Sequence, residues 1–95
     1  MTTTEKIFNE VSRVTGIAVT KMKSPSREWP IVEARMLFIL YMARDGASDE
    51  KIALALCRAR PTVTRSRHNA AQYLTASKSF REKFNKIFQT DYSTD

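Results

Sequence analysis

The longest apolar stretch of the chain, Met36 to Met42, constrains the fold more than any other feature of the sequence. Its seven residues fall far short of the roughly 20 that a helix needs to span a bilayer. Apolar residues also recur at helical spacing through the surrounding segment, which makes the helix apolar nearly all round. Such a helix is expected only where neighbours pack on several of its sides. The sequence therefore predicts a buried central helix from about Pro30 to Asp45, with Gly46 as its C-terminal stop.

Helical patterns extend over most of the remaining chain, and no alternating strand pattern interrupts them. The other expected helices cover about 4–15, 17–22, 48–56, 61–74 and 77–89, with Thr4, Ser48 and Ser77 as N-caps and Gly16 as a stop. Several aromatic residues are expected in the core, among them Trp29, Phe38, Tyr41 and Phe88. The predicted fold class is all-α: a compact bundle of about six helices in one domain, 1–95, with an ordered core of about 4–89 and a frayed tail at 90–95.

Positive charge is concentrated in the second half of the chain. The formal net charge is +6, and the sequence pI is about 9.8. Residues 1–50 carry seven basic and seven acidic side chains, whereas residues 51–95 carry nine basic and three acidic ones. No acidic residue occurs between Lys51 and Arg81. A localised basic excess favours an anionic partner, with nucleic acid first and an acidic membrane surface second.

The sequence lacks the residue sets that enzymes and metal sites require. Cys57 and His68 are the only cysteine and the only histidine, which excludes an internal disulfide and a cysteine-based or two-histidine zinc site. Cys57 has no base and orienting partner, and no Gly-x-x-x-x-Gly-Lys phosphate loop is present. We therefore expect no enzymatic activity, no cofactor and no metal. The unpaired thiol and the polar N-terminus favour a cytoplasmic location.

The segments 48–56 and 61–74, joined by a tight turn, match a helix-turn-helix motif that contains a recognition helix at about 61–74. The N-terminal part of such a helix enters the major groove of double-stranded DNA. We expect Arg65 to bind guanine and Asn69 to bind adenine. The other expected contacts are with phosphates or thymine methyl groups, from Arg58, Arg60, Thr62, Thr64, Arg67 and His68.

Four short segments add a family resemblance. Ile31-Val32-Glu33-Ala34-Arg35 places an arginine before the longest helix, and Ser26-Arg27-Glu28 forms a basic lead-in to it. Ser48-Asp49-Glu50-Lys51-Ile52 begins a short helix, and Phe80-Arg81-Glu82-Lys83 lies in the closing one. These segments resemble the C-terminal DNA-binding domain (domain IV) of DnaA, the bacterial chromosomal replication initiator. The resemblance spans nearly the whole chain, with Trp29-Pro30 as a short insertion.

The family's signature, at the start of its recognition helix, has an altered form in this chain. The family usually carries Gly-Gly-Arg-Asp-His-Thr-Thr-Val there. The matching stretch, Cys57 to Val63, is one residue shorter and lacks both the glycine pair and the Asp-His. Because the groups that recognise the family's target site are replaced, we expect a target sequence different from the DnaA box.

The resemblance also implies particular DNA contacts. Arg60, Pro61 and Thr62 match positions that reach bases in the major groove. Arg35 matches an arginine that enters the minor groove, and Arg27 matches a residue near the DNA backbone. Without the resemblance, an arginine in an apolar helix such as Arg35 is more often one that extends its charge to solvent or forms an ion pair.

These observations predict a domain that binds double-stranded DNA in replication or transcription control. Because no ATPase motif accompanies it, we expect a phage, prophage or other mobile-element origin and a nucleoid-associated location. A homodimer or a second protein chain would compensate for the few base pairs that one domain contacts. Two alternatives stay open: a protein-interaction module whose basic face docks an acidic partner, and a solvated face that only maintains solubility. Membrane binding is disfavoured because the core needs the apolar stripes.

Overall fold

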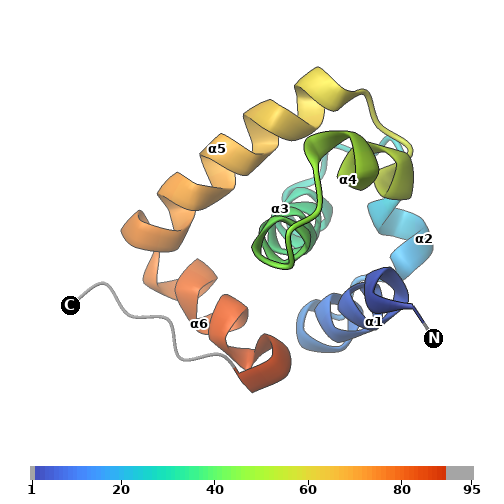
Figure 1. Ribbon diagram of the computed structural model, residues 1–95. Coiled ribbons are helices and arrows are strands. Elements are labelled where there is room, and N and C mark those ends of the chain that lie inside the picture. Colours follow the sequence, from blue (N-terminus) through green and yellow to red (C-terminus); the bar gives the residue numbers. More distant parts are fainter. Residues whose placement is uncertain (1, 90–95) are drawn as a thin grey trace.

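Helix α3 (Trp29–Arg44) runs through the centre of the molecule, and the other helices surround it (Figure 1). The structure is a computed structural model that describes residues 2–89. Ten of the 16 residues of α3 are buried, which confirms the predicted central helix. Pro30 lies in its first turn. Gly46, just past the helix end, takes the left-handed conformation (φ 90°) that favours glycine.

Five further helices pack around α3: α1 (Thr3–Thr15), α2 (Val19–Met22), α4 (Asp49–Leu56), α5 (Arg60–Ala76) and α6 (Lys78–Lys86). A 3-10 turn, η1 (Ile87–Gln89), follows α6. No strand occurs within residues 2–89, so the all-helical prediction is confirmed for this part of the chain. None of these helices has the length and apolar character needed to cross a bilayer.

Predicted capping residues set three of the helix ends. The Ser48 hydroxyl accepts a hydrogen bond from the Lys51 N–H (3.2 Å) at the start of α4. The Ser77 hydroxyl accepts one from the Phe80 N–H (3.2 Å) at the start of α6. Gly16 ends α1 with a left-handed backbone (φ 74°). Local sequence signals are therefore sufficient at these three positions.

The predicted cap at Thr4 is wrong, because Thr2 caps α1. The Thr2 hydroxyl accepts a hydrogen bond from the Glu5 N–H (3.1 Å), so that the helix begins at Thr3. Thr4 then lies inside the first turn. The spacing Thr2-x-x-Glu5 is that of a capping box, in which an acidic residue follows the cap by three positions. The correct signal was thus present in the sequence, two residues earlier.

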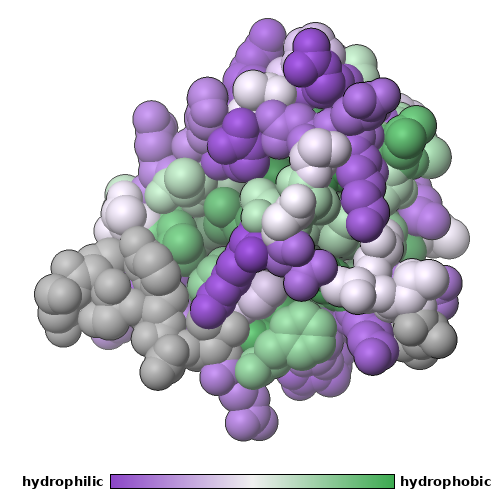
Figure 2. Space-filling model, viewed as in Figure 1, coloured by the Kyte–Doolittle hydropathy of each residue, from purple (hydrophilic) through white to green (hydrophobic). Residues whose placement is uncertain are grey.

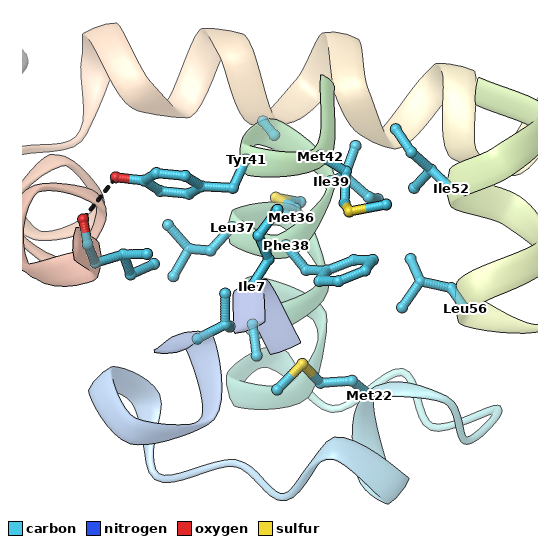
Figure 3. Close-up of a cluster of buried hydrophobic side chains, with 14 of the residues drawn as sticks. Ile7, Met22, Met36, Leu37, Phe38, Ile39, Tyr41, Met42, Ile52 and Leu56 are labelled. Carbon is cyan, nitrogen blue, oxygen red and sulfur yellow. Dashed lines mark hydrogen bonds between the residues drawn. The ribbon is translucent and has the colours of Figure 1, made fainter. Parts of the chain in front are cut away.

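Side chains from the surrounding helices meet on α3 in one continuous core (Figure 3). Phe38 stacks on Phe8 of α1, with ring centroids 3.8 Å apart. Tyr41 stacks on Phe84 of α6 at 4.5 Å. The single Tyr41 O–H donates a hydrogen bond shared between two carbonyl oxygens, those of Phe84 (2.7 Å) and Ile87 (2.9 Å). Tyr41 therefore ties the end of α6 to the central helix.

Two aromatic residues expected in the core are half exposed instead. Phe88 is 49% exposed and Trp29 is 47% exposed, whereas Phe38 and Tyr41 are buried as predicted. α6 ends at Lys86, three residues before the predicted end, because Ile87 is extended (ψ 120°) and Phe88 is left-handed (φ 53°), so helical spacing no longer applies at Phe88. Trp29 is the first residue of α3 and precedes its buried part. The predicted frayed tail, 90–95, lies outside the described residues.

Replacing Tyr41 with Phe should remove the hydrogen bonds to the carbonyls at the end of α6 and keep the ring stacking. We expect the free energy of unfolding to fall by about 1–2 kcal/mol, because buried carbonyl groups lose their donor. Urea unfolding followed by circular dichroism measures this change. The matched control is Tyr73→Phe, since Tyr73 is 39% exposed. Equal losses in the two variants would contradict the role assigned to Tyr41.

Candidate nucleic-acid interface

A short connection joins α4 to α5 and sets the direction of α5. Cys57 takes a left-handed conformation (φ 56°) at the end of α4, and the Arg58 N–H donates to the Ala53 carbonyl oxygen (2.9 Å). Helix ends of this geometry usually carry glycine. α5 begins at Arg60, with Pro61 in its first turn, where the missing N–H has no intrahelical partner to lose. A short helix, a tight turn and a longer helix thus follow in the predicted order.

The two sides of α5 differ sharply in character. Val63, Ala70 and Leu74 face the core and are buried, as predicted, while Ser66 is half-buried. The exposed residues near the N-terminal end are Arg60, Pro61, Thr62, Arg65, His68 and Asn69. Figure 2 shows hydrophilic side chains along the edge of the molecule that α5 occupies. The outward side of α5 is therefore basic and polar.

Arg60 and Arg65 are available to a ligand. Neither side chain forms an ion pair or a hydrogen bond with any residue that the structure describes. Both are exposed. Arg65 and Asn69 lie about one helical turn apart, so their side chains are neighbours on the outward side. This is the side on which base contacts are expected.

Asp49 on α4 holds two of the residues for which DNA contacts are predicted. Its carboxylate accepts hydrogen bonds from Arg67 Nε (2.8 Å), from Arg67 Nη2 (3.0 Å) and from the Thr64 hydroxyl (2.8 Å). The Arg67 hydrogen bond and then the Thr64 hydrogen bond lower the pKa of Asp49 to about 2. Thr64 and Arg67 are thus engaged in joining α4 to α5. Nothing in the local sequence points to this cluster, because Asp49 precedes its partners by 15 and 18 residues.

Arg35 is buried inside the bundle and is only 9% exposed. Its Nε donates to the Met22 carbonyl oxygen (2.7 Å), and its Nη2 donates to the Ser24 carbonyl oxygen. It pairs with no carboxylate among the described residues, so it is neither a surface-seeking arginine nor half of an ion pair. Burial, followed by the positive charge of Arg58, lowers the pKa of Arg35. Insertion of Arg35 into a minor groove would require its bonds to the α2–α3 loop to break.

The same loop meets the start of α5 in a cleft rich in arginine. Arg58 also donates to the Ser24 carbonyl oxygen, so that two guanidinium groups converge on one acceptor. The cleft has a volume of about 300 Å³ and is lined by Pro25, Ser26, Arg27, Arg35, Arg58 and Thr62. A smaller hollow of about 130 Å³ adjoins Arg35, Arg58 and Thr62. The fold thus brings together four predicted contact residues from distant parts of the sequence.

The predicted contact residues therefore divide into three groups. One group is exposed on α5, a second lines the cleft, and Thr64 and Arg67 are bound to Asp49. Cys57 is exposed in the turn. Within residues 2–89, no three His, Cys, Asp or Glu side chains are grouped so that they could hold a metal ion.

The Asp49 cluster leads to a pH-dependent prediction. An aspartate whose pKa falls from 3.8 to about 2 on folding contributes its full stabilisation at pH values above 3.8. This contribution is lost as the pH falls through that range, because protonation breaks the bonds to Arg67 and Thr64. At neutral pH, Asp49→Asn should lower the free energy of unfolding by about 1 kcal/mol, the upper end for solvent-accessible ion pairs. It should also flatten the pH dependence between the two pKa values.

Urea unfolding at neutral pH and at several pH values across this range measures both effects. The matched control is Glu50→Gln, because Glu50 is also in the first turn of α4 but is exposed. If both variants lost the same stability, the charge at the helix N-terminus would explain the effect, and the bonds to Arg67 and Thr64 would not.

No protein-family model, no curated protein and no solved structure matches the chain. Function is therefore inferred from the arrangement of residues in the cleft and on α5, together with the resemblance in the sequence.

Proposed function

We propose that this protein binds double-stranded DNA through a helix-turn-helix formed by α4 and α5, in the control of replication or transcription. One observation carries the proposal: the exposed side of α5 presents Arg60 and Arg65 without any partner among the described residues. Guanidinium groups that make no contact within the protein have their hydrogen-bond donors available to an anion or a base edge. The basic excess of the chain, +6, favours the same partner.

Base contacts would come from the N-terminal half of α5. An α-helix fits the major groove of B-DNA, where guanine offers two acceptors to an arginine and adenine offers a donor and an acceptor to an asparagine. Arg65 and Asn69 have the exposure and the spacing for these two contacts. Thr62, which is exposed in the first turn of α5, suits a phosphate or a thymine methyl group. Arg67 takes no part in this arrangement, because Asp49 already binds it.

The likeness to the DnaA C-terminal domain receives support at the turn. Cys57 has the left-handed conformation that favours glycine, and it corresponds to the glycine pair of the family's signature. The chain differs from the family's signature three and four residues after Cys57, where Arg60 and Pro61 stand in place of Asp-His. We therefore propose a DnaA-like fold whose target sequence differs from the DnaA box. A phage or mobile-element origin belongs to the same proposal.

Fluorescence anisotropy with labelled duplex DNA tests the proposal. We expect binding at low salt and a slope of about −5 for log affinity against log salt, since about five or six phosphate contacts are available. Arg65→Ala should weaken binding to a selected duplex by about 10-fold or more. The control is Arg44→Ala, which removes an exposed arginine at the far end of α3. Absence of binding at low salt would overturn the proposal.

Selection of bound duplexes from a random pool then separates two forms of the proposal. An enriched motif would establish that α5 recognises a sequence. Binding without enrichment would leave a protein that binds the DNA backbone alone.

A second candidate function is docking of an acidic protein partner. It uses the same exposed basic face of α5, and the half-exposed aromatic pair Trp29 and Tyr73, whose rings lie 5.4 Å apart, offers a further contact on α3 and α5. Tryptophan, tyrosine and arginine are the residues most enriched at the energetic centres of protein interfaces. Under this alternative, Trp29→Ala would abolish partner binding and duplex DNA would not compete with the partner.

A further inference from the structure

Two charged side chains at the base of α5 lack a counter-charge. Arg35 and Arg58 both donate to the carbonyl oxygen of Ser24. Neither pairs with a carboxylate in the part of the chain that the structure describes. An arginine stays protonated in a protein, so two positive charges lie side by side and only carbonyl dipoles oppose them. Such a pair is stabilised by an anion placed between the two groups.

The cleft beside this pair gives an anion access to it. The hydrogen bonds of Arg35 use Nε and Nη2, and its Nη1 has no partner within residues 2–89. Every fully buried side-chain nitrogen or oxygen atom in this part of the chain does have a hydrogen-bond partner. Nη1 of Arg35 is therefore not fully buried, and Arg35 lines the cleft although its side chain as a whole is only 9% exposed. The cleft wall also includes the exposed Arg27, which has no ion pair among the described residues, and contains no acidic residue.

The N-terminus of α5 borders the same cleft through Thr62. The first N–H groups of an α-helix have no acceptor within the helix. Ala59, which precedes α5, offers no side-chain oxygen to accept from them. Thr62 lies in this first turn and lines the cleft. Uncapped N–H groups at the positive end of a 17-residue helix favour a negatively charged ligand.

We infer that this cleft binds one phosphate group, held by Arg27, Arg58 and Thr62 on its walls and by Arg35 at its base. A phosphate group has several acceptor oxygens, which suits three arginine side chains and uncapped backbone N–H groups together. The inference rests on the proposed function for the source of the phosphate, which we take to be the backbone of the bound duplex. Arg35 then contributes to a fixed backbone contact, and it keeps its bonds to the α2–α3 loop.

A phosphate in this cleft would set the position of α5 on the duplex. Arg58 precedes α5 by two residues, and Thr62 lies in its first turn. A phosphate bound there is held at the end of the helix that enters the groove. Phosphate contacts fix register and orientation, whereas base contacts select the sequence. Loss of the cleft should therefore weaken binding to all duplexes alike.

The first measurement is a titration of the full 95-residue chain with inorganic phosphate at constant ionic strength, followed by amide and arginine Nε–H NMR signals. We expect saturable shifts at Thr62 and at the Nε–H groups of Arg35 and Arg58. Arg58→Gln and Arg27→Gln should each weaken phosphate binding by about 5-fold or more, as each removes a charge-assisted hydrogen bond. Arg44→Gln, remote from the cleft, should leave it unchanged. Arg27 is exposed and makes no ion pair among described residues, so its variant keeps the test valid if Arg58→Gln unfolds.

The second measurement is duplex binding by the same variants across a range of salt concentrations. We expect Arg58→Gln to reduce the magnitude of the salt slope by about one and to weaken different duplexes equally. Saturable phosphate binding without duplex binding would support the cleft, identify a free phosphate compound as its ligand and overturn the proposed function. Duplex binding with an unchanged slope, and no saturable shift at the cleft, would overturn this inference and leave the proposed function standing. Shifts spread over all basic residues without saturation would overturn the inference too.

Discussion

Burial of α3 on nearly every side is the constraint on which the rest of the molecule depends. Ten of its 16 residues are buried. Burial of a large apolar side chain such as leucine, isoleucine or phenylalanine contributes about 1.5–3 kcal/mol to stability. Each surrounding helix needs only one apolar face to cover part of α3. The outer faces of those helices are consequently free of packing requirements. α5 can carry exposed arginines because its contribution to the core is limited to a narrow stripe that includes Val63, Ala70 and Leu74.

Elements that depend on neighbouring residues were predictable from the sequence. The central helix, the caps Ser48 and Ser77 and the stop at Gly16 all follow from signals within a few positions along the chain. The exposed Phe88 was not predictable in this way, since helical spacing assumes that the helix continues. Its backbone leaves the helical conformation, and the side chain leaves the core with it. A local pattern is thus reliable only up to the residue at which the helix ends.

Interactions between distant segments account for what the sequence did not reveal about the candidate site. Asp49 and Arg67 are 18 residues apart, and each has a plausible local role as a helix-end charge or a surface cation. Only the packing of α4 on α5 shows that they bind each other. The carbonyl oxygen of Ser24 is still harder to anticipate, because backbone acceptors carry no sequence signal. Both cases show that the sequence alone does not reveal which arginines already have partners within the protein.

Asp49 also determines which side of α5 is free. By binding Thr64 and Arg67, it neutralises the flank that faces α4. Arg65, exposed and with no ion pair among the described residues, keeps its full charge on the outward side. The positive surface of α5 is therefore less extensive than the acid-free sequence suggests.

Under the proposed function, this geometry would separate affinity for DNA from sequence specificity along α5. The cleft includes Arg58, just before α5, and Thr62 in its first turn, whereas Arg65 and Asn69, which suit base edges, lie beyond that turn. A contact at the helix start can thus hold the protein on any duplex while residues further along vary. Arg60 and Pro61, which stand where the DnaA signature has Asp-His, lie between the cleft residues Arg58 and Thr62. Pro61 has no N–H to offer a phosphate, whereas its fixed φ suits the first turn of a helix. Under the proposed function, these two residues would change base recognition, while Arg27, Arg35 and Arg58 would still be present to bind a phosphate.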